Sequence, residues 1–149
     1  MITAKQAAKY LVSLCDDDAG DSISNLKLQK LLYYSQGVHL ALHGKRLFNE
    51  PIEAWMHGPV VPSIYHELKV FGSGAVEIDE GIDLDQVGDE ERETLEEVFE
   101  VFGQFSAWKL RNMTHEEPPW RDTPQGLEIP RKKLRQYFRT LLEEEEDDE

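Results

Sequence analysis

Two histidines and a glutamate are the residues of this sequence best suited to bind a metal ion. His57 and the pair His115-Glu116 fall in stretches expected to be loops, each near a tryptophan. Two imidazole nitrogens and a carboxylate form a ligand set that suits zinc or iron. No spacing rule ties the three together, and a histidine beside a Gly-Pro turn can equally bond a backbone carbonyl and fix the loop. A metal-dependent hydrolase that uses His57, His115 and Glu116 is therefore one hypothesis.

His39 and His43 have the four-residue spacing of metal ligands on a helix, but their context favours a structural role. Zinc proteases with this spacing carry a glutamate directly after the first histidine, where Leu40 stands here. Elsewhere we find no set of nucleophile, base and orienting group, and no glycine-rich phosphate loop. The sequence therefore predicts no catalytic residues, no bound metal and no cofactor, and we expect a protein that is not an enzyme.

The aromatic residues in the expected loops indicate binding rather than chemistry. Tryptophan is enriched among the residues that carry most of the binding energy at protein interfaces. Trp55 and Trp108 fit core packing equally well, whereas Trp120 follows two prolines and is expected to be partly exposed. A long proline-rich loop, such as residues 114–130, is often functional in a compact domain. The candidate partner-binding residues come from two stretches and are Trp55, His57, Gly58, Pro59, Thr114, His115 and Trp120.

The charge balance argues against direct contact with nucleic acid. The formal net charge is −14, and every residue of the run 143–149 is acidic. Phosphates repel such a chain, so we expect no nucleic-acid binding. Acidity also suits an acidic phage regulatory protein, a DNA mimic or the binding of a basic partner, and these alternatives stay open. The basic cluster at 131–139 is expected to neutralise the acidic run rather than to meet phosphate.

The sequence carries no signal for the membrane or for secretion. Cys15 is the only cysteine, which excludes a disulfide framework. No apolar run approaches the ~20 residues of a membrane span, and the N-terminus lacks the apolar stretch of a secretory signal. We therefore expect a cytoplasmic protein without membrane contact.

The elements that must position these residues are organised around one long helix. Ser24 is a typical N-cap and Gly44 a typical stop, so this helix is expected to span about 24–44. Its apolar residues form two stripes on opposite sides, which predicts a helix packed on both faces. The larger stripe consists of Leu28, Leu31, Leu32, Ser35, Val38, His39 and Leu42, and the smaller of Leu26, Tyr33 and Leu40.

Shorter elements are expected before and after this helix. Thr3 and Gln6 form a capping box, which opens a helix that ends before the acidic run 16–21. Short strands are expected at 52–55 and 75–78, with Gly58-Pro59 in a turn. The later helices are expected to begin at residues typical of caps or first turns, namely Pro62, Asp89, Ser106 and Pro130.

Together these patterns predict a mainly α fold. The 149 residues suffice for one domain with its own core. We expect a single compact helical domain of about six helices with one or two short β-strands. The domain is expected to span 1–142, and 143–149 to form a disordered, dispensable acidic tail.

Three motifs resemble those of the Panacea domain, the SocA-like antitoxin family that is often labelled phage-associated. They are LQKLLYY at 28–34, AWMHGPVV at 54–61, and THE at 114–116 followed by Pro119 and Trp120. Each motif alone has little specificity, but here they occur together and in the order that the family has them.

The resemblance implies an antitoxin of a type II toxin–antitoxin system, which binds its cognate toxin protein and neutralises it directly. It also implies action as a proteolytic adaptor that delivers the toxin to a cytosolic AAA+ protease. No catalytic residues are established for the family, so none is carried over. Many members have an added N-terminal DNA-binding domain, whereas the motifs here begin almost at once, which argues against transcriptional autoregulation.

Overall fold

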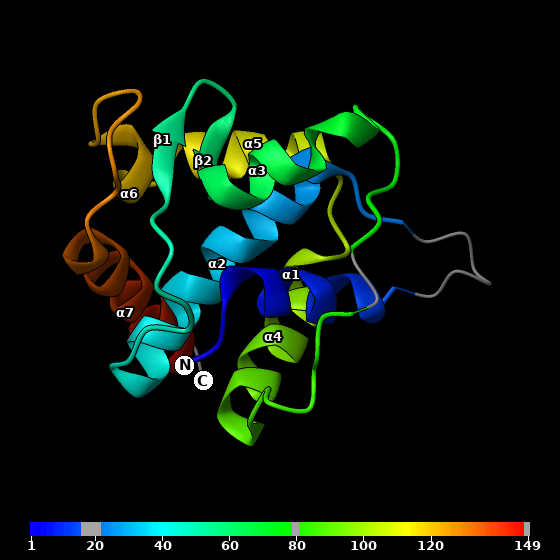
Figure 1. Ribbon diagram of the computed structural model, residues 1–149. Helices are drawn as coiled ribbons and strands as arrows, with labels where there is room; N and C mark the ends of the chain where they lie inside the picture. The colour runs from blue at the N-terminus through cyan, green and yellow to red at the C-terminus, as the bar shows by residue number, and fades with distance from the viewer. Residues whose placement is uncertain (16–21, 79–80, 148–149) are drawn as a thin grey trace.

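One long helix, α2 (Asn25–His43), runs through the middle of the molecule. The computed structural model describes residues 1–15, 22–78 and 81–147 of the chain. Every residue from 28 to 40 is buried, which confirms the prediction of a helix packed on both faces. The elements packed against it (Figure 1) are α1 (Ala4–Ser13), α3 (Pro62–Leu68), α4 (Asp89–Phe102), α5 (Ala107–His115), α7 (Arg131–Asp147) and strand β2 (Gly58–Val60).

The two ends of α2 follow from the residues that flank it. The Ser24 hydroxyl accepts a hydrogen bond from the Lys27 amide at 3.2 Å, and Gly44 closes the helix with a φ of 66°. Both boundaries were predicted, because serine caps and left-handed glycines satisfy backbone groups that the helix leaves unpaired. The stripe prediction is wrong at Leu42, which is 52% exposed because the last turn of α2 leaves the core.

Helices α1 and α4 lie along one side of α2. The predicted capping box of α1 is confirmed by bonds between Thr3 and Gln6 of 2.9 and 3.0 Å. The acidic run 16–21, which was expected to follow this helix, lies outside the described residues. Gly88 rather than Asp89 is the N-cap of α4, so that prediction is wrong by one position. Asp89 is the first helical residue, where the helix dipole favours a carboxylate.

The small sheet is a hairpin of β1 (Glu53–Trp55) and β2, paired antiparallel with Trp55 opposite Gly58. The first predicted strand is confirmed, but the second is wrong, because β1 pairs with Gly58–Val60 and not with 75–78. Met56 and His57 form the turn, and Gly58-Pro59 is strand rather than turn. Proline is tolerated in such an edge strand, where no ladder bond requires its missing N–H.

The other edge of β1 is covered by the chain around 126–129. The Ala54 amide donates to the Leu127 carbonyl at 3.0 Å, and the Ile129 amide donates to the Ile52 carbonyl at 2.8 Å. The hairpin is thus fixed on both sides, since β2 lies on α2 and β1 lies against this segment. Its backbone is held more firmly than its shortness alone would predict, because an isolated hairpin is only marginally stable.

Short helices complete the end of the molecule that carries the hairpin. Pro62 opens α3 as expected, and a 3-10 segment, η2 (Lys69–Phe71), leads to Gly72. Ser106 caps α5 as predicted. The expected loop at 114–130 is wrong in its first part, because Thr114 and His115 belong to α5 and a further helix, α6 (Pro118–Arg121), follows. The prolines there start a helix, since a first turn needs no N–H from them.

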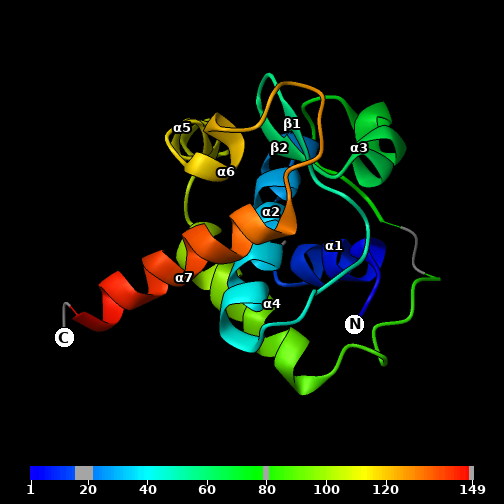
Figure 2. The same ribbon diagram turned by 90° about the vertical axis from the view of Figure 1, so that its left-hand side faces the viewer.

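The last helix, α7, packs its first half on α2. Gly37 of α2 lies so close to the Phe138 ring that a Cβ at this position would clash with it. The second half of α7 projects from the body of the molecule (Figure 2). Helix α7 includes residues 143–147, which were expected to be disordered tail. The domain boundary at 142 and the dispensability of the tail remain predictions.

The architecture is mainly α, as predicted from the sequence. The described residues hold seven α-helices, one 3-10 segment and one two-stranded sheet. None of the helices in these ranges is both long and apolar enough to cross a membrane. The hairpin lies at one end of the molecule, and both the start of α1 and the end of α7 lie toward the other end (Figures 1 and 2).

Candidate functional site

Two neighbouring polar residues of α2 hold the hairpin on the core. The Gln29 amide oxygen accepts from the Val61 backbone amide at 2.9 Å, while its nitrogen donates to Asn25 at 2.9 Å. The Lys30 ammonium group donates to the Pro59 carbonyl at 3.0 Å. These side chains do for β2 what a neighbouring strand would do, because they pair its otherwise unbonded backbone groups. The motif at 28–34 therefore holds the motif at 54–61.

Lys30 is fully buried, which is unusual for a lysine. Burial, and secondarily the positive charge of Arg111, lowers the pKa of its amine to about 7. Gly58 covers it closely, since a Cβ there would lie 2.7 Å from the Lys30 Cε and 2.8 Å from the Thr114 hydroxyl. Gly58 also has a φ of 108°, which other residues adopt only with strain. Glycine is required at this point by both contact and conformation.

A buried carboxylate joins α2 to the start of α6. The hydroxyls of Tyr33 and Tyr34 donate to the two oxygens of Glu117 at 2.8 and 2.9 Å. Burial raises the pKa of Glu117 to about 7, although the hydrogen bonds from the tyrosines work in the opposite direction. The Tyr34 ring also stacks on Phe102 of α4 at 4.0 Å between centroids. This cluster fixes α5 and α6 relative to α2.

Trp120 and His115 form the link between this cluster and the hairpin. Their rings stack at 3.9 Å between centroids and are tilted by only 6°. The Trp120 indole N–H donates to the Trp55 carbonyl at 2.7 Å, so it bonds directly to β1. Burial, followed by the charges of Arg111 and Lys30, lowers the pKa of His115. A neutral imidazole stacked on an indole is a packing element, which places these two residues in the support of the hairpin.

Four side chains at the hairpin turn and on α5 form an exposed surface, which we call the hairpin–α5 surface. It consists of Met56, His57, Trp108 and Arg111. Met56 is 64% exposed and Trp108 is 56% exposed. The Arg111 guanidinium lies 4.4 Å from the Trp108 ring centre and donates from Nε to the His57 Nδ1 at 3.3 Å. Trp120 is partly exposed, as expected. Trp108 is more exposed than Trp120, so the alternative interpretation, that Trp108 packs in the core, is wrong.

The predicted partner-binding residues come together at one end of the molecule but fall into two groups. His57 lies on the hairpin–α5 surface, while Trp55 lies half-buried in the strand behind it. The other five make internal contacts. Gly58 and Pro59 form the inward-facing part of the hairpin, and Thr114, His115 and Trp120 pack against it.

Sequence reasoning missed the three charged residues at the centre of this arrangement, Lys30, Arg111 and Glu117. A signal existed for Lys30, because it lies among the apolar residues 28–34 of a helix predicted to pack on both faces. Glu117 gave no such signal, since two acids and two prolines in a row resemble a solvated loop. Only the fold brings it to the tyrosines of α2.

The three residues of the metal hypothesis do not converge. His57 accepts from Arg111, His115 stacks on Trp120, and Glu116 is exposed at the end of α5. In residues 1–15, 22–78 and 81–147, no three His, Cys, Asp or Glu side chains are arranged to hold a metal ion. His39, expected to be structural, is buried and pairs with the Thr94 hydroxyl at 2.8 Å.

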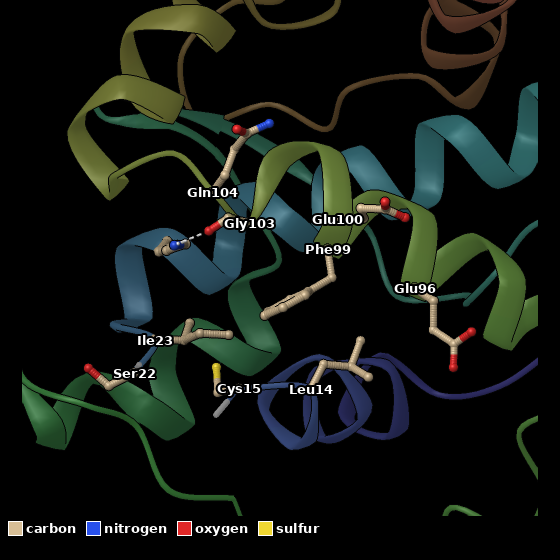
Figure 3. A pocket seen from close by; sticks show the side chains of 10 residues that line it. Leu14, Cys15, Ser22, Ile23, Glu96, Phe99, Glu100, Gly103 and Gln104 are labelled. Carbon is tan, nitrogen blue, oxygen red and sulfur yellow. Dashed lines mark hydrogen bonds between the residues drawn. The ribbon is translucent and has the colours of Figure 1, made fainter. Parts of the chain in front are cut away.

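A cavity of about 650 Å³ lies away from the hairpin, between α1, α4 and the start of α2 (Figure 3). At its edge the Lys27 ammonium group donates to the Gly103 carbonyl at 2.6 Å. None of the predicted partner-binding residues lines it. Its walls are formed by Leu14, Cys15, Ser22, Ile23, Lys27, Glu96, Phe99, Glu100, Gly103 and Gln104. The predicted binding residues and this cavity are thus separate features of the surface.

The site thus belongs to a helical domain in which α2 holds a short hairpin and Trp120 of α6 bonds to it. The chain belongs to the family described as antitoxin SocA-like, Panacea domain, which matches residues 28–121. It is similar to the antitoxin SocA of Caulobacter vibrioides (strain NA1000 / CB15N), with 54% identity over 43 residues. That stretch is 29% of this chain and spans 23% of the relative's length. No solved structure matches the chain.

Proposed function

We propose that this protein is an antitoxin that neutralises a cognate toxin protein by direct contact through the hairpin–α5 surface. Membership of the SocA-like family supports an antitoxin role. The observation that carries the choice of surface is the exposed Trp108, held in place by the guanidinium of Arg111. Tryptophan and arginine are enriched among the residues that dominate protein interfaces.

The support beneath this surface suits it to binding. Lys30 and Gln29 fix β2, and Trp120 fixes β1, so the turn between the strands is anchored on both sides. Binding costs free energy whenever side chains or loops must be ordered, and a preorganised surface lowers that cost. The buried polar contacts therefore support the hairpin–α5 surface, because they keep Met56 and His57 beside α5.

The finer part of the proposal concerns what happens to the bound toxin. As in the family resemblance described above, we propose that the protein works in the cytoplasm as an adaptor, delivering the toxin to a AAA+ protease. In that case the toxin should disappear faster in cells that contain the antitoxin than in cells that lack it. A pulse-chase measurement of toxin half-life, with and without the protease gene, tests this step separately from neutralisation.

The experiment that tests the central proposal is co-expression with the protein encoded by the neighbouring gene. We expect the neighbour to arrest growth alone, and co-expression to restore it. An affinity tag on one protein should then retain the other through size-exclusion chromatography in a stable complex. A harmless neighbour, or relief of toxicity without any complex, contradicts direct neutralisation.

A further inference from the structure

A second cavity, of about 390 Å³, opens next to the hairpin–α5 surface and shares Met56 and His57 with it. It lies between the hairpin, the first turn of α2, and α3 with η2. Its apolar walls include Trp55 and Tyr65, whose rings meet edge to face at 5.0 Å. Cavities of ~300–1,000 Å³ with apolar walls hold small ligands or single large side chains. This one is therefore large enough for an aromatic or aliphatic anchor from a partner.

The residues that line this cavity differ in charge from the chain as a whole. The chain carries a net charge of −14, yet no residue that lines the cavity is acidic. The one lining lysine is Lys69, and Arg111 stands beside His57 at the rim. Some exposed cations of the chain are paired with carboxylates, as in Lys5 with Glu67 at 2.6 Å. Within the described part of the chain, neither Lys69 nor Arg111 has a carboxylate partner.

From these observations we propose that the cavity and its rim bind a short acidic segment of the partner protein. One large apolar side chain of that segment enters the cavity, and neighbouring carboxylates meet Lys69 and Arg111. Arg111 keeps donors for this purpose, because only Nε and Nη1 are engaged with His57 and Asn112. A guanidinium is well suited to bind a carboxylate through two parallel hydrogen bonds. The inference rests on the proposed function, since it names the segment of the toxin that is recognised.

The negative net charge does not prevent such binding at physiological salt. Charges farther apart than a Debye length, about 8 Å at 0.15 M, are largely screened in water. The nearest charges then decide the interaction. Lys69 and Arg111 are the positive ones, while the Glu53 carboxylate is occupied by the Trp55 indole N–H, from which it accepts a hydrogen bond at 3.0 Å. Raising the salt concentration should weaken the complex, because it screens these cations as well.

The first test uses the complex with the neighbouring gene product. Lys69→Glu should weaken binding at least about tenfold, while Lys69→Arg should preserve it. Lys132→Glu is the matched control, because Lys132 is an exposed lysine on α7, away from the cavity. Affinity is measured by isothermal titration calorimetry, and circular dichroism checks that each variant is folded. If Lys69→Glu binds as tightly as the control, the inference fails while the proposed function stands.

The second test does not depend on the toxin. A short fluorescein-labelled peptide with one phenylalanine among aspartates and glutamates is compared, by fluorescence anisotropy, with the same peptide in which lysines replace the acids. Wild-type protein should bind the acidic peptide at least about tenfold more tightly than the basic one, and Lys69→Glu should remove the difference. Equal affinities, or no binding of the acidic peptide up to about 1 mM, overturn the inference.

The chain's own acidic end is the competing occupant in both tests. A version that ends at residue 142 should bind the acidic peptide as the full chain does. If truncation tightens binding about tenfold or more, the cavity receives the acidic end of this chain, and the inference about a partner segment is wrong. A failed search for a toxin leaves the peptide result decisive, so failure of the proposed function and failure of this inference are distinguishable.

Discussion

The buried network under the hairpin and the hairpin–α5 surface are built from the same stretch of chain, yet they have opposite properties. In residues 56–59, Met56 and His57 point outward, while Gly58 and Pro59 pack against Lys30. The inner pair is defined by contacts within the molecule, so almost any change should affect folding. The outer pair makes few internal contacts, so changes there should affect binding. A single motif therefore combines support and recognition.

Among the residues that support the hairpin from within, Gly58→Ala should cause the largest loss of stability. The new Cβ would meet the Lys30 side chain and the Thr114 hydroxyl at under 3 Å, at a φ of 108°. Backbone strain and overpacking each cost about 1–3 kcal/mol, so we expect a loss of about 4 kcal/mol in the free energy of unfolding. Urea denaturation followed by circular dichroism measures it.

Gly126→Ala is the matched control for this variant. Gly126 has a φ of 85°, but a Cβ there meets no atom within 4 Å. It therefore carries backbone strain without the contact, and should cost about 1–2 kcal/mol. Equal losses for both variants would show that the close packing of Gly58 on Lys30 contributes nothing.

The next effect in size concerns Glu117 and pH. Its pKa is about 7 in the folded protein, against 4.5 for an ordinary glutamate. The folded state therefore holds this proton more tightly, so the stability it contributes is fully present below pH 4.5 and is lost as the pH rises to about 7. The shift corresponds to about 3 kcal/mol at most. Measured against Glu117→Gln, the wild type should lose stability by up to this amount between pH 4.5 and 7.

The comparison with Glu117→Gln is needed because another buried group titrates over an overlapping pH range. Burial, and then the charge of His43, lowers the pKa of His39 to about 4, so its contribution is lost as the pH falls below 6.5. That effect has the opposite sign and is common to both proteins, so it cancels in their difference. A difference that does not change with pH would mean that Glu117 titrates normally.

On the hairpin–α5 surface, we expect Trp108→Ala to have a smaller effect, which should appear in binding alone. Truncating an aromatic anchor typically costs ~2 kcal/mol, which is roughly thirtyfold in affinity. Stability should change by less than about 1 kcal/mol, since the side chain is exposed and its contact with Arg111 is weak in water. Leu42→Ala is the control, because Leu42 is similarly exposed at the far end of α2. Equal toxin affinities for the two variants would place the interface elsewhere.

The smallest effect is expected from removing residues 143–149. Acidic residues at the C-terminal end of α7 are opposed by the helix dipole, so the helix gains little from them. We expect the melting temperature of the truncated chain to shift by less than about 3 °C, which corresponds to roughly 0.5 kcal/mol. A larger loss in differential scanning calorimetry would show that these residues dock on the rest of the chain, with the basic cluster at 131–139 as the complementary surface.

The parts of the fold predicted from sequence are those decided by local chemistry. Ser24 and Gly44 set the ends of α2, and Thr3 with Gln6 sets the start of α1, because cap bonds depend on residues only a few positions apart. The second strand was placed wrongly because the partner of β1 is chosen by the turn and by the bonds from Lys30.

The candidate site was predicted as a set of residues but not as an arrangement. Trp55, His57 and Trp120 were proposed as partner-binding residues from two motifs, and in the structure Trp120 bonds to Trp55, two residues before His57. The division between support and surface depends on tertiary contacts, such as Glu117 with Tyr33 and Tyr34, across more than 80 positions. No local pattern encodes contacts at that separation, so Trp108 could not be assigned to the surface from sequence.

Lys30 gives the hairpin a chemical reporter of its own movements. An amine with a pKa of about 7 is about half unprotonated in neutral solution, whereas most lysines are almost fully protonated there. Because Gly58 and Pro59 cover it, an acylating reagent reaches it only when β2 lifts away from α2. The rate of its acetylation, resolved by mass spectrometry, thus counts openings of the hairpin. A bound partner that holds the turn closed should slow the acetylation of Lys30, although the partner does not contact this residue.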